Sequence, residues 1–600
     1  MEESREIRPI TQLLAELGIT EADTFGPHKA KVNLSIFDRL KNSQIGHYVV
    51  VAGITPTPQG EGKSTACIGL SQALASVGKR VVTCMRQPSM GPTFGIKGGA
   101  AGGGRSQIVP MEEFNLHLTG DVHAISIANN LLCAQLDTRR FHEETCSTEL
   151  LFEKLFPRGE GGLRKISKIL ESRILKLGLD PHNIDEFTLE QRALISRLNI
   201  DPNSIMINRV VDVNDRLLRG ITIGEGGKCA RATQVDIAVS SEIMAVMALA
   251  EDLGDLKARL ARMVVVFDAA GSCVTVDDLG LTGALTVLLK DALNPTLMQT
   301  MEGTPVFVHC GPFANIAHGN SSVIADQMAL KLVGPNGYVV TECGFGSDMG
   351  LEKLVNIKCR QSGLAPSCVV LVATCRALKH HGFGTAHELG AHAPLLTGLC
   401  NLEAHIGIAK NFNLPVVVCV NRHVGDSPDE LEIVVRGALK AGADFAGIGD
   451  HFARGGEGAT ELAEMIVQAC ALPRSPLRFT YPSSHCLRDK ITAVCTQIYG
   501  ASAVDFSADS EKDIARFEKS GFSHFPICMA KTQYSLSHDP NLLGRPTGFT
   551  VPILRCRASV GAGFIYLLAG PIMTMPGLPI RPAFYDIDID PKTGKIEGMF

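Results

Sequence analysis

The sequence predicts an α/β protein with a mainly parallel sheet, and three observations lead to this fold class. Short, continuous runs rich in β-branched residues recur along the chain and are bounded by Gly, Pro or Asn. The stretches between them show helical periodicity. The runs are apolar throughout, which is typical of strands covered by helices on both faces. The expected strands are residues 48–54, 80–85, 263–267, 305–310, 338–341, 368–374 and 415–420.

Length and composition indicate a folded chain of several domains. Its 600 residues are 45% hydrophobic and 20% charged, the balance of a globular protein. Chains beyond roughly 300 residues usually divide into domains. We expect a large N-terminal domain at 1–365 and two smaller α/β domains at 366–472 and 473–600. Residues 152–201, charged and helical in pattern, are expected to form a surface insertion.

Charge and hydropathy exclude several classes of partner. The formal net charge of -5 provides no basic field for nucleic acid or an anionic membrane surface, so small-molecule substrates are expected. No apolar run reaches about 18 residues, the length that a membrane-spanning helix needs. The first six residues are acidic and lack the apolar core of a signal peptide, which predicts a cytoplasmic protein.

The 18 cysteines contain no C-x-x-C spacing. Several of them, such as Cys368 and Cys419, lie inside apolar runs. Buried reduced thiols are therefore expected, rather than a structural metal or disulfides.

A phosphate-binding loop is predicted directly after the first expected strand. The loop leads from an apolar run into a helix-like segment, the context that a P-loop requires. Backbone N–H groups around two glycines would surround phosphate oxygens, Lys63 would reach the terminal phosphates, and Ser64 would hold Mg²⁺. Thr57 stands where the pattern G-x-x-x-x-G-K-[ST] has its first Gly, so the match is partial, and the alternative is an ordinary Gly-rich turn. The expected nucleotide-binding residues are Thr57, Pro58, Gln59, Gly60, Glu61, Gly62, Lys63, Ser64 and Thr65.

Arg86 closes the second expected strand, at the ligand end of a P-loop-type sheet. Its planar guanidinium could hold a carboxylate or an acyl phosphate with two hydrogen bonds. The alternative is an arginine paired with a structural carboxylate. Five glycines follow at residues 98–104, a pattern more typical of a flexible linker than of an anion site.

The succession of these motifs resembles the formate–tetrahydrofolate ligases, or 10-formyltetrahydrofolate synthetases, over essentially the whole chain. The segments that carry the resemblance are residues 55–65, 86–104, 116–121, 212–216, 302–305, 311–319, 341–346, 528–535 and 573–579. Residues 152–201 and the pair Arg86-Gln87 look more like the eukaryotic branch of that family than the bacterial one.

The resemblance implies an enzyme that joins formate to tetrahydrofolate with ATP, through a formyl phosphate intermediate. It implies Lys63, Arg86 and Asp121 as catalytic residues, and Ser64 and Asp121 as contacts of Mg²⁺. The alternative role for Asp121 is an N-cap of the expected helix at 123–132. The family also implies activation by a monovalent cation such as K⁺, and a homotetramer. Domain 1–365 would then carry ATP and formyl phosphate, and domain 366–472 would bind folate.

Asn315 and His318 are expected to contact adenine or ribose, because they follow an expected strand within the 311–319 motif. A core histidine with its hydrogen bonds satisfied is an equal alternative for His318. Glu342 ends another expected strand and would contact Mg²⁺ or order water. A plain loop carboxylate is an equal alternative for it.

The expected folate site departs from the family pattern. Most relatives have a Phe and a Trp where this chain has His423 and Phe452, and the chain contains no tryptophan. Stacking on an aromatic ring contributes about 1 to 3 kcal/mol, so these exchanges would weaken folate binding by roughly 1 kcal/mol. Residues 379–394 also differ from the family pattern.

Two other functions are alternatives to the ligase. One is a P-loop ATPase without a further substrate, in which the segments 86–104 and 573–579 would have no role. The other is a folate-binding relic without turnover, suggested by His423 and Phe452. Such a relic would not need Lys63, Ser64 and Arg86, so the ligase is favoured.

Overall fold

The computed structural model describes residues 7–95, 100–382, 392–570 and 572–599. Within these ranges, no helix is long and apolar enough to cross a membrane.

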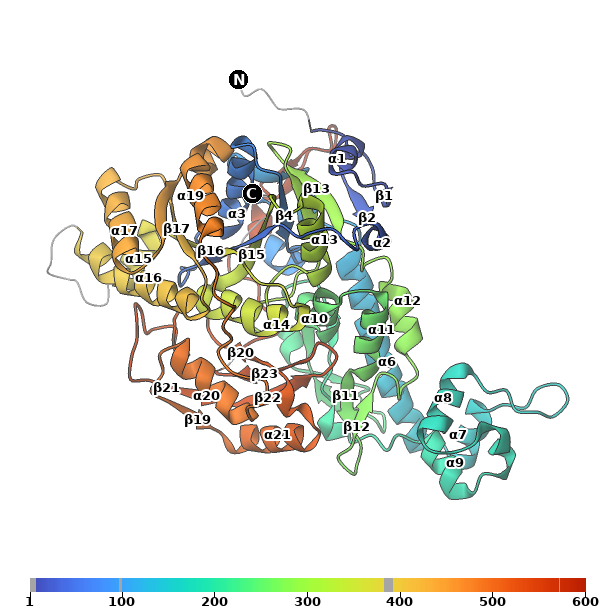
Figure 1. Ribbon diagram of the computed structural model, residues 1–600. Coiled ribbons are helices and arrows are strands. Elements are labelled where there is room, and N and C mark those ends of the chain that lie inside the picture. The colour runs from blue at the N-terminus through green and yellow to red at the C-terminus, as the bar shows by residue number, and fades with distance from the viewer. Residues whose placement is uncertain (1–6, 96–99, 383–391, 571, 600) are drawn as a thin grey trace.

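A twelve-stranded sheet forms the centre of the molecule, with strand order β1-β2-β13-β14-β4-β15-β3-β16-β17-β18 and with β5 and β6 attached beside β13 (Figure 1). All pairings from β14 to β18 are parallel, and the pairings among β1, β2, β13, β14, β5 and β6 are antiparallel. The parallel strands are β14 (Pro305–Val308), β4 (Val81–Met85), β15 (Tyr338–Gly346), β3 (His47–Gly53), β16 (Cys368–Ala373), β17 (Val416–Asn421) and β18 (Phe445–Gly449). The antiparallel edge holds β1 (Ala22–Thr24), β2 (Ala30–Val32), β13 (Thr296–Thr300), β5 (Gly102–Gly103) and β6 (Ser106–Val109). The expected mainly parallel sheet is therefore confirmed.

Helices cover both faces of the sheet, which is why its strands are apolar on both sides. On β3, Val49 and Val51 belong to one core with α3 (Lys63–Ser76) and α19 (Thr460–Ala471). Val50 and Ala52 point the other way and belong to the core that contains α13 (Val323–Val333) and α16 (Ala393–Asn411).

Local sequence signals fix several helix starts. Ser427 and Glu430 form a capping box at α17 (Pro428–Lys440), whose first residue is proline. The Ser322 hydroxyl caps α13 by accepting the Ala325 amide. Further helices of the body are α1 (Ile10–Leu17), α2 (Ile36–Arg39), α4 (Met90–Phe94), α5 (Met111–Asn115), α6 (Asp121–Thr145), α10 (Glu242–Leu249), α11 (Leu253–Arg262), α12 (Thr282–Leu289), α14 (Arg360–Ser362), α15 (Cys375–Gly382) and α18 (His451–Arg454).

One expected strand lies elsewhere than predicted. Residues 263–267 contain β11 (Val264–Phe267), which pairs antiparallel with β12 (Cys273–Thr275) outside the main sheet. Val264, Val265 and Val266 are nevertheless buried. An apolar run indicates that a strand is buried but not which sheet it joins. The sequence therefore could not distinguish β11 from the strands of the parallel sheet.

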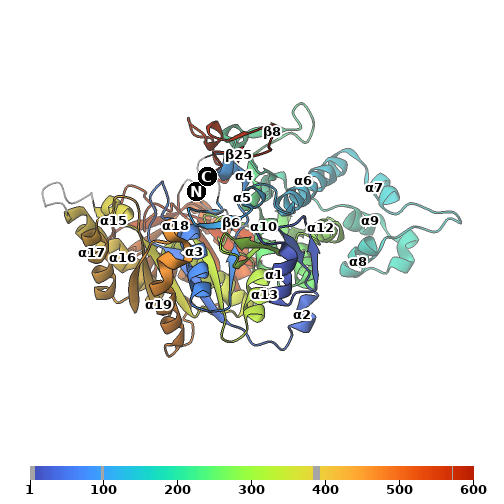
Figure 2. The ribbon, with the colours of Figure 1, turned by 90° about the horizontal axis from the view of Figure 1, so that it is seen from above.

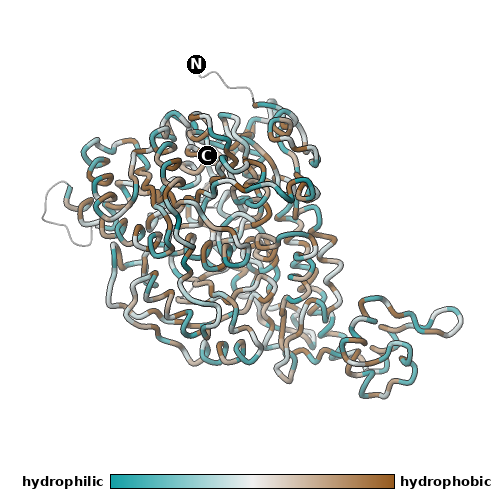
Figure 3. The backbone as a smooth tube through the Cα atoms, viewed as in Figure 1, coloured by the Kyte–Doolittle hydropathy of each residue, from teal (hydrophilic) through white to brown (hydrophobic). Residues whose placement is uncertain are grey.

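The segment at 152–201 projects from the body, as expected. Helices α7 (Thr148–Leu155), α8 (Lys168–Lys176) and α9 (Leu189–Ser196) protrude on the side opposite to α15 and α17 in two perpendicular views (Figures 1 and 2). Hydrophobic and hydrophilic stretches alternate along this projection (Figure 3). Phe152 and Phe156 centre a small core of its own, separate from the main core.

The C-terminal part packs below the main sheet in Figure 1. It contains a three-stranded sheet of β20 (Ile527–Ala530), β23 (Phe564–Leu568) and β22 (Arg555–Ser559), and the parallel pair β19 (Ala503–Phe506) and β21 (Thr550–Ile553). Helices α20 (Leu487–Gln497) and α21 (Ala508–Lys519) flank these strands. The short pairs β7 (Arg209–Val211) with β10 (Val235–Ile237), β8 (Ile221–Ile223) with β9 (Arg231–Thr233), and β24 (Asp588–Ile589) with β25 (Ile596–Glu597) complete the strands. The main sheet runs without interruption across residue 365, because β16 pairs with β3.

Candidate active site

The loop between β3 and α3 is held in shape by its own residues. The Thr57 amide and hydroxyl both donate to Glu61 Oε1, at 2.8 and 2.7 Å. Gly60 and Gly62 have φ of +78° and +69°, the left-handed region that glycine adopts without strain. The Glu61 side chain thus points inward and holds the loop by hydrogen bonds. A ligand could therefore contact the backbone of the loop and the N-terminus of α3.

Lys63 is the first residue of α3 and lies across the end of β3. A Cβ atom on Gly53 would come within 2.9 Å of Lys63 Cδ, so the strand must end in glycine for the lysine side chain to pass. The site therefore places a cation at a helix N-terminus, where an anion is already favoured by the helix dipole.

Glu342 joins two residues that the sequence analysis had placed in separate roles. Its Oε2 accepts the Ser64 hydroxyl at 2.6 Å, and its Oε1 accepts Arg86 Nε and Nη2 at 3.2 and 3.1 Å. This arrangement follows from strand order, since β15 lies between β4 and β3. Glu342 is only 5% exposed, so its charge needs a partner, and Arg86 supplies it.

Asp121 is the first residue of α6 but does not cap it. Gly120 is the N-cap, and Asp121 Oδ1 instead forms an ion pair of 2.7 Å with Lys31, with both side chains buried. Burial raises the pKa of Asp121, while Lys31 opposes that shift. Its Oδ2 has no hydrogen-bond partner within the part of the chain that the structure describes. Over that same part, no group of three or more His, Cys, Asp and Glu residues could hold a metal ion.

The two residues expected at the nucleotide base differ in access. Asn315 is half-buried and its amide donates to Gln533 Oε1 at 3.2 Å and to the Lys531 carbonyl at 3.4 Å. His318 is completely buried, and burial lowers its pKa well below the usual value. Both of its ring nitrogens are buried and have no hydrogen-bond partner among the described residues, so His318 is not a core histidine whose polar atoms are satisfied.

The two residues expected at the folate site lie beyond neighbouring strands β17 and β18. His423 is half-buried, and burial together with nearby Arg376 lowers its pKa. Phe452 is 52% exposed, and a Cβ atom on Gly103 would lie 3.0 Å from its ring. Among the described residues, no ring contact joins His423 to Phe452, so a flat ligand would have to enter between them to touch both.

Three residues that the sequence did not single out hold the loop between β3 and α3 from the next strands. Thr374 follows β16 and donates to Glu61, Arg376 donates to the Gly60 carbonyl, and Asn421 ends β17 and donates to the Glu61 carbonyl at 3.0 Å. The signal was present, because ligands and their supports gather at the carboxyl ends of parallel strands. The altered segment at 379–394 contains residues 383–391, which lie outside the described residues.

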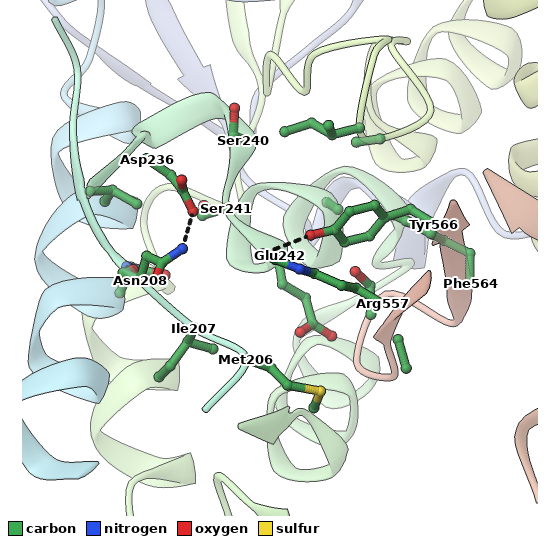
Figure 4. Close-up of a pocket in the computed structure, with 17 residues that line it drawn as sticks. Met206, Ile207, Asn208, Asp236, Ser240, Ser241, Glu242, Arg557, Phe564 and Tyr566 are labelled. Carbon is green, nitrogen blue, oxygen red and sulfur yellow. Dashed lines mark hydrogen bonds between the residues drawn. The ribbon is translucent and has the colours of Figure 1, made fainter. Parts of the chain in front are cut away.

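A polar cavity lies apart from this edge, between α10 and the C-terminal strands β22 and β23 (Figure 4). Arg557 donates to the Tyr566 hydroxyl at 3.3 Å, and Glu242 accepts the Gly561 amide at 2.7 Å. Burial raises the pKa of Glu242 to about 7. Ile316 and Ala317 also line the cavity, so it adjoins the segment that contains Asn315.

Comparison with known proteins places this geometry in a family. The sequence model of formate–tetrahydrofolate ligase matches residues 1–600. The chain is 54% identical over 608 residues to the formate–tetrahydrofolate ligases of Spinacia oleracea and Arabidopsis thaliana, covering 98% of this chain and 95% of each relative. It is 52% identical over 606 residues to the mitochondrial monofunctional C1-tetrahydrofolate synthase of Bos taurus, covering 98% of this chain and 62% of that relative. The chain therefore belongs to the formate–tetrahydrofolate ligase family.

Proposed function

We propose that this chain ligates formate to tetrahydrofolate at the carboxyl edge of the main sheet, with ATP on the loop after β3 and formate on Arg86. Formate–tetrahydrofolate ligase activity, in one-carbon metabolism, is what its family performs. The observation that carries the assignment of the site is the single buried carboxylate of Glu342, which contacts both Ser64 and Arg86. A phosphate site and a carboxylate site are thereby held side by side.

The first step would transfer the terminal phosphoryl group of ATP to formate. A formate oxygen attacks the γ-phosphorus, the bond to the β-phosphate oxygen breaks, and ADP leaves with that electron pair. The product is formyl phosphate. Lys63 and the amides at the start of α3 would bind the phosphate oxygens, and Arg86 would hold the formate carboxylate in line. Glu342 fixes the Nε and Nη2 side of the guanidinium, which orients the remaining N–H groups.

The donors at Ser64 fit Mg²⁺. Its hydroxyl and a Glu342 carboxylate oxygen lie 2.6 Å apart, and oxygen donors are those that Mg²⁺ prefers. Bound there, Mg²⁺ would neutralise charge on the phosphate oxygens. Asp121, with its unpartnered Oδ2, is proposed as support toward Mg²⁺ or the folate amine.

The second step would place the pterin of tetrahydrofolate near His423 and Phe452. N10 attacks the formyl carbon, the bond from that carbon to the phosphate oxygen breaks, and N10 loses its proton as phosphate leaves. Since β17 lies two strands from β3, the strand ends that lead to His423 and to the loop before α3 are separated by roughly 10 Å of sheet. Asn315 is proposed to contact the nucleotide, and Thr57 to Thr65 to surround its phosphates.

Lys63→Ala tests the assignment of the phosphate site. The variant should lose ligation, measured as 10-formyltetrahydrofolate after acid conversion to its methenyl form, while its melting temperature stays close to that of the parent chain. Lys79→Ala, which removes a lysine beyond the other end of α3, should keep full activity. Turnover by Lys63→Ala at the parental rate would show that ATP binds elsewhere.

Two further properties rest on the family alone. We propose a homotetramer, which light scattering coupled to gel filtration would establish by mass. We also propose a cytoplasmic location, which some related enzymes share while others are mitochondrial.

A further inference from the structure

Thr55, two residues before the phosphate loop begins, has all of its polar groups bonded by side chains from α15 and α16. Its amide donates to Asn401 Oδ1 at 3.3 Å, and its carbonyl lies 3.0 Å from His381 Nε2. Its hydroxyl lies 2.9 Å from both Asn401 Nδ2 and His405 Nε2. All four residues are buried.

The hydrogen bonds run in one consistent direction. Asn401 Nδ2 can only donate, so the Thr55 hydroxyl accepts from it and donates its own proton to His405 Nε2. His405 Nδ1 then carries the ring proton and donates to the Ser347 hydroxyl at 2.7 Å. Ser347 in turn donates to the His405 carbonyl at 3.3 Å. Burial lowers the pKa of His405 to about 4, so the ring is neutral at physiological pH, as this chain of donors requires.

The same side chains tie the loop to the C-terminal part of the protein. The Gly544 amide donates to His381 Nδ1 at 3.3 Å, which leaves the proton of that ring on Nε2, facing the Thr55 carbonyl. Asn401 Nδ2 also donates to the Gly544 carbonyl at 2.8 Å. The amide and the carbonyl of Gly544 are thus both bonded to the side chains that bond Thr55.

We propose that Asn401, His405 and His381 are positioning residues that set the start of the phosphate loop for ATP, a role that rests on the proposed function of that loop. Packing alone does not require polar groups here, since an apolar residue of the same shape would fill the site of Thr55 without a polar network. A fully satisfied buried network instead selects one backbone geometry. Phosphoryl transfer needs that geometry, because a misplacement of about 1 Å costs up to roughly a hundredfold in rate.

The test is the pair Thr55→Val and Thr55→Ser. Valine keeps the shape but leaves the Asn401 and His405 nitrogens without the hydroxyl, whereas serine keeps the hydroxyl. The KM for ATP should rise about tenfold in Thr55→Val, with the KM for tetrahydrofolate within about twofold of the parent, and Thr55→Ser should restore most of the loss. Ile406→Ala is the control, because Ile406 is buried on the same helix but lies outside the network.

The proposal is supported if Thr55→Val raises the KM for ATP, but not that for tetrahydrofolate, by more than Ile406→Ala does when both variants lose the same amount of melting temperature. It is overturned if Thr55→Val leaves the KM for ATP within about twofold, or if the constants for ATP and tetrahydrofolate move together. Lys63→Ala, assayed in parallel, separates the two hypotheses. If Lys63→Ala retains turnover, the assignment of the phosphate site is wrong. If Lys63→Ala is inactive while Thr55→Val has the parental KM for ATP, only the positioning role is rejected.

Discussion

At the scale of single residues, Glu342 contacts the same two side chains, Ser64 and Arg86, that are expected to bind the ligands. Ser64 is the residue expected on Mg²⁺, and Arg86 is the one expected on formate, yet both donate to this carboxylate. A partly buried guanidinium without a counter-charge would be costly, so the pairing with Glu342 orders Arg86. Arg86 retains 23% side-chain exposure, which leaves part of it accessible to a carboxylate.

Glu342→Gln should therefore impair the first chemical step more than folate binding. Glutamine keeps one acceptor oxygen for Arg86 but presents an N–H donor where the second carboxylate oxygen accepted the Ser64 hydroxyl, and it removes the negative charge beside the expected metal. Hydrogen bonds to charged groups contribute about 1.5 to 3 kcal/mol, so kcat/KM for ATP should fall roughly 10- to 100-fold. Kinetics against Mg²⁺ concentration would check this. If the variant keeps the parental Mg²⁺ requirement, Glu342 has no role toward the metal.

Arg86→Lys tests whether the positive charge of Arg86 or the planar shape of its guanidinium matters at this site. Lysine keeps the positive charge but has no planar fork with which to bind Glu342 and formate at once. The KM for formate should rise more than the KM for ATP, by about tenfold against less than threefold. Initial rates with each substrate varied in turn give both constants. Equal losses for the two substrates would point to a purely structural arginine.

At the scale of elements, the strands were largely predictable, because a strand buried on both faces leaves an unbroken apolar run. The expected run at 368–374 contains β16, and the run at 415–420 overlaps β17. The prediction failed for β11, where the same apolar signal belongs to a separate antiparallel pair. The Glu342 bridge could not be predicted, because it depends on β15 lying between β4 and β3, and no local pattern encodes that order. The rule that ligands bind beyond the carboxyl ends of parallel strands points to this edge of the sheet, but it does not say which side chains meet there.

Glu242, the first residue of α10, should make the free energy of unfolding depend on pH. Burial raises the pKa of Glu242 from 4.5 to about 7, so the folded state holds a proton that the unfolded chain has lost over that interval. Stability from this group is fully present below about pH 4.5 and is lost as pH rises to about 7. Glu242→Gln keeps an acceptor for the Gly561 amide and should be more stable than the parent above pH 7, by up to about 3 kcal/mol.

Chemical denaturation of both chains from pH 5 to 8 would measure this difference. Burial also raises the pKa of Glu352 to about 7, so only the difference between the two proteins reports on Glu242. A difference that stays constant with pH would mean that Glu242 is ionised in the fold at all of these pH values.

At the scale of the whole molecule, one sheet edge brings together segments that are far apart in the chain. The Arg105 amide donates to the Phe452 carbonyl at 2.8 Å, which fixes the glycine-rich segment 102–104 against α18. The Phe452 ring thereby lies beside the start of α3, where phosphates are expected, and His423 follows β17 two strands away from β3. A short path between the two steps suits an acyl phosphate intermediate, which water would otherwise hydrolyse.

This arrangement makes a specific prediction for the folate site. If His423 and Phe452 stack on the two faces of the pterin, the double variant His423→Phe with Phe452→Trp enlarges both rings. The KM for tetrahydrofolate should then fall roughly fivefold, equivalent to about 1 kcal/mol of stacking, while the KM for ATP stays unchanged because the gain belongs to one ligand.

The dependence on pH provides an independent check of the same site. Burial and nearby Arg376 lower the pKa of His423, so its ring becomes charged only under more acidic conditions than an ordinary histidine. Any loss of folate affinity through His423 should therefore appear only at acidic pH in the parent chain, and His423→Phe should abolish it because phenylalanine cannot titrate. Constants for both substrates from about pH 5.5 to 8.5, a range that brackets histidine titration, would resolve this. A double variant with an unchanged or higher KM for tetrahydrofolate would show that the pterin binds away from these rings, since larger aromatic faces can only strengthen a stack that exists.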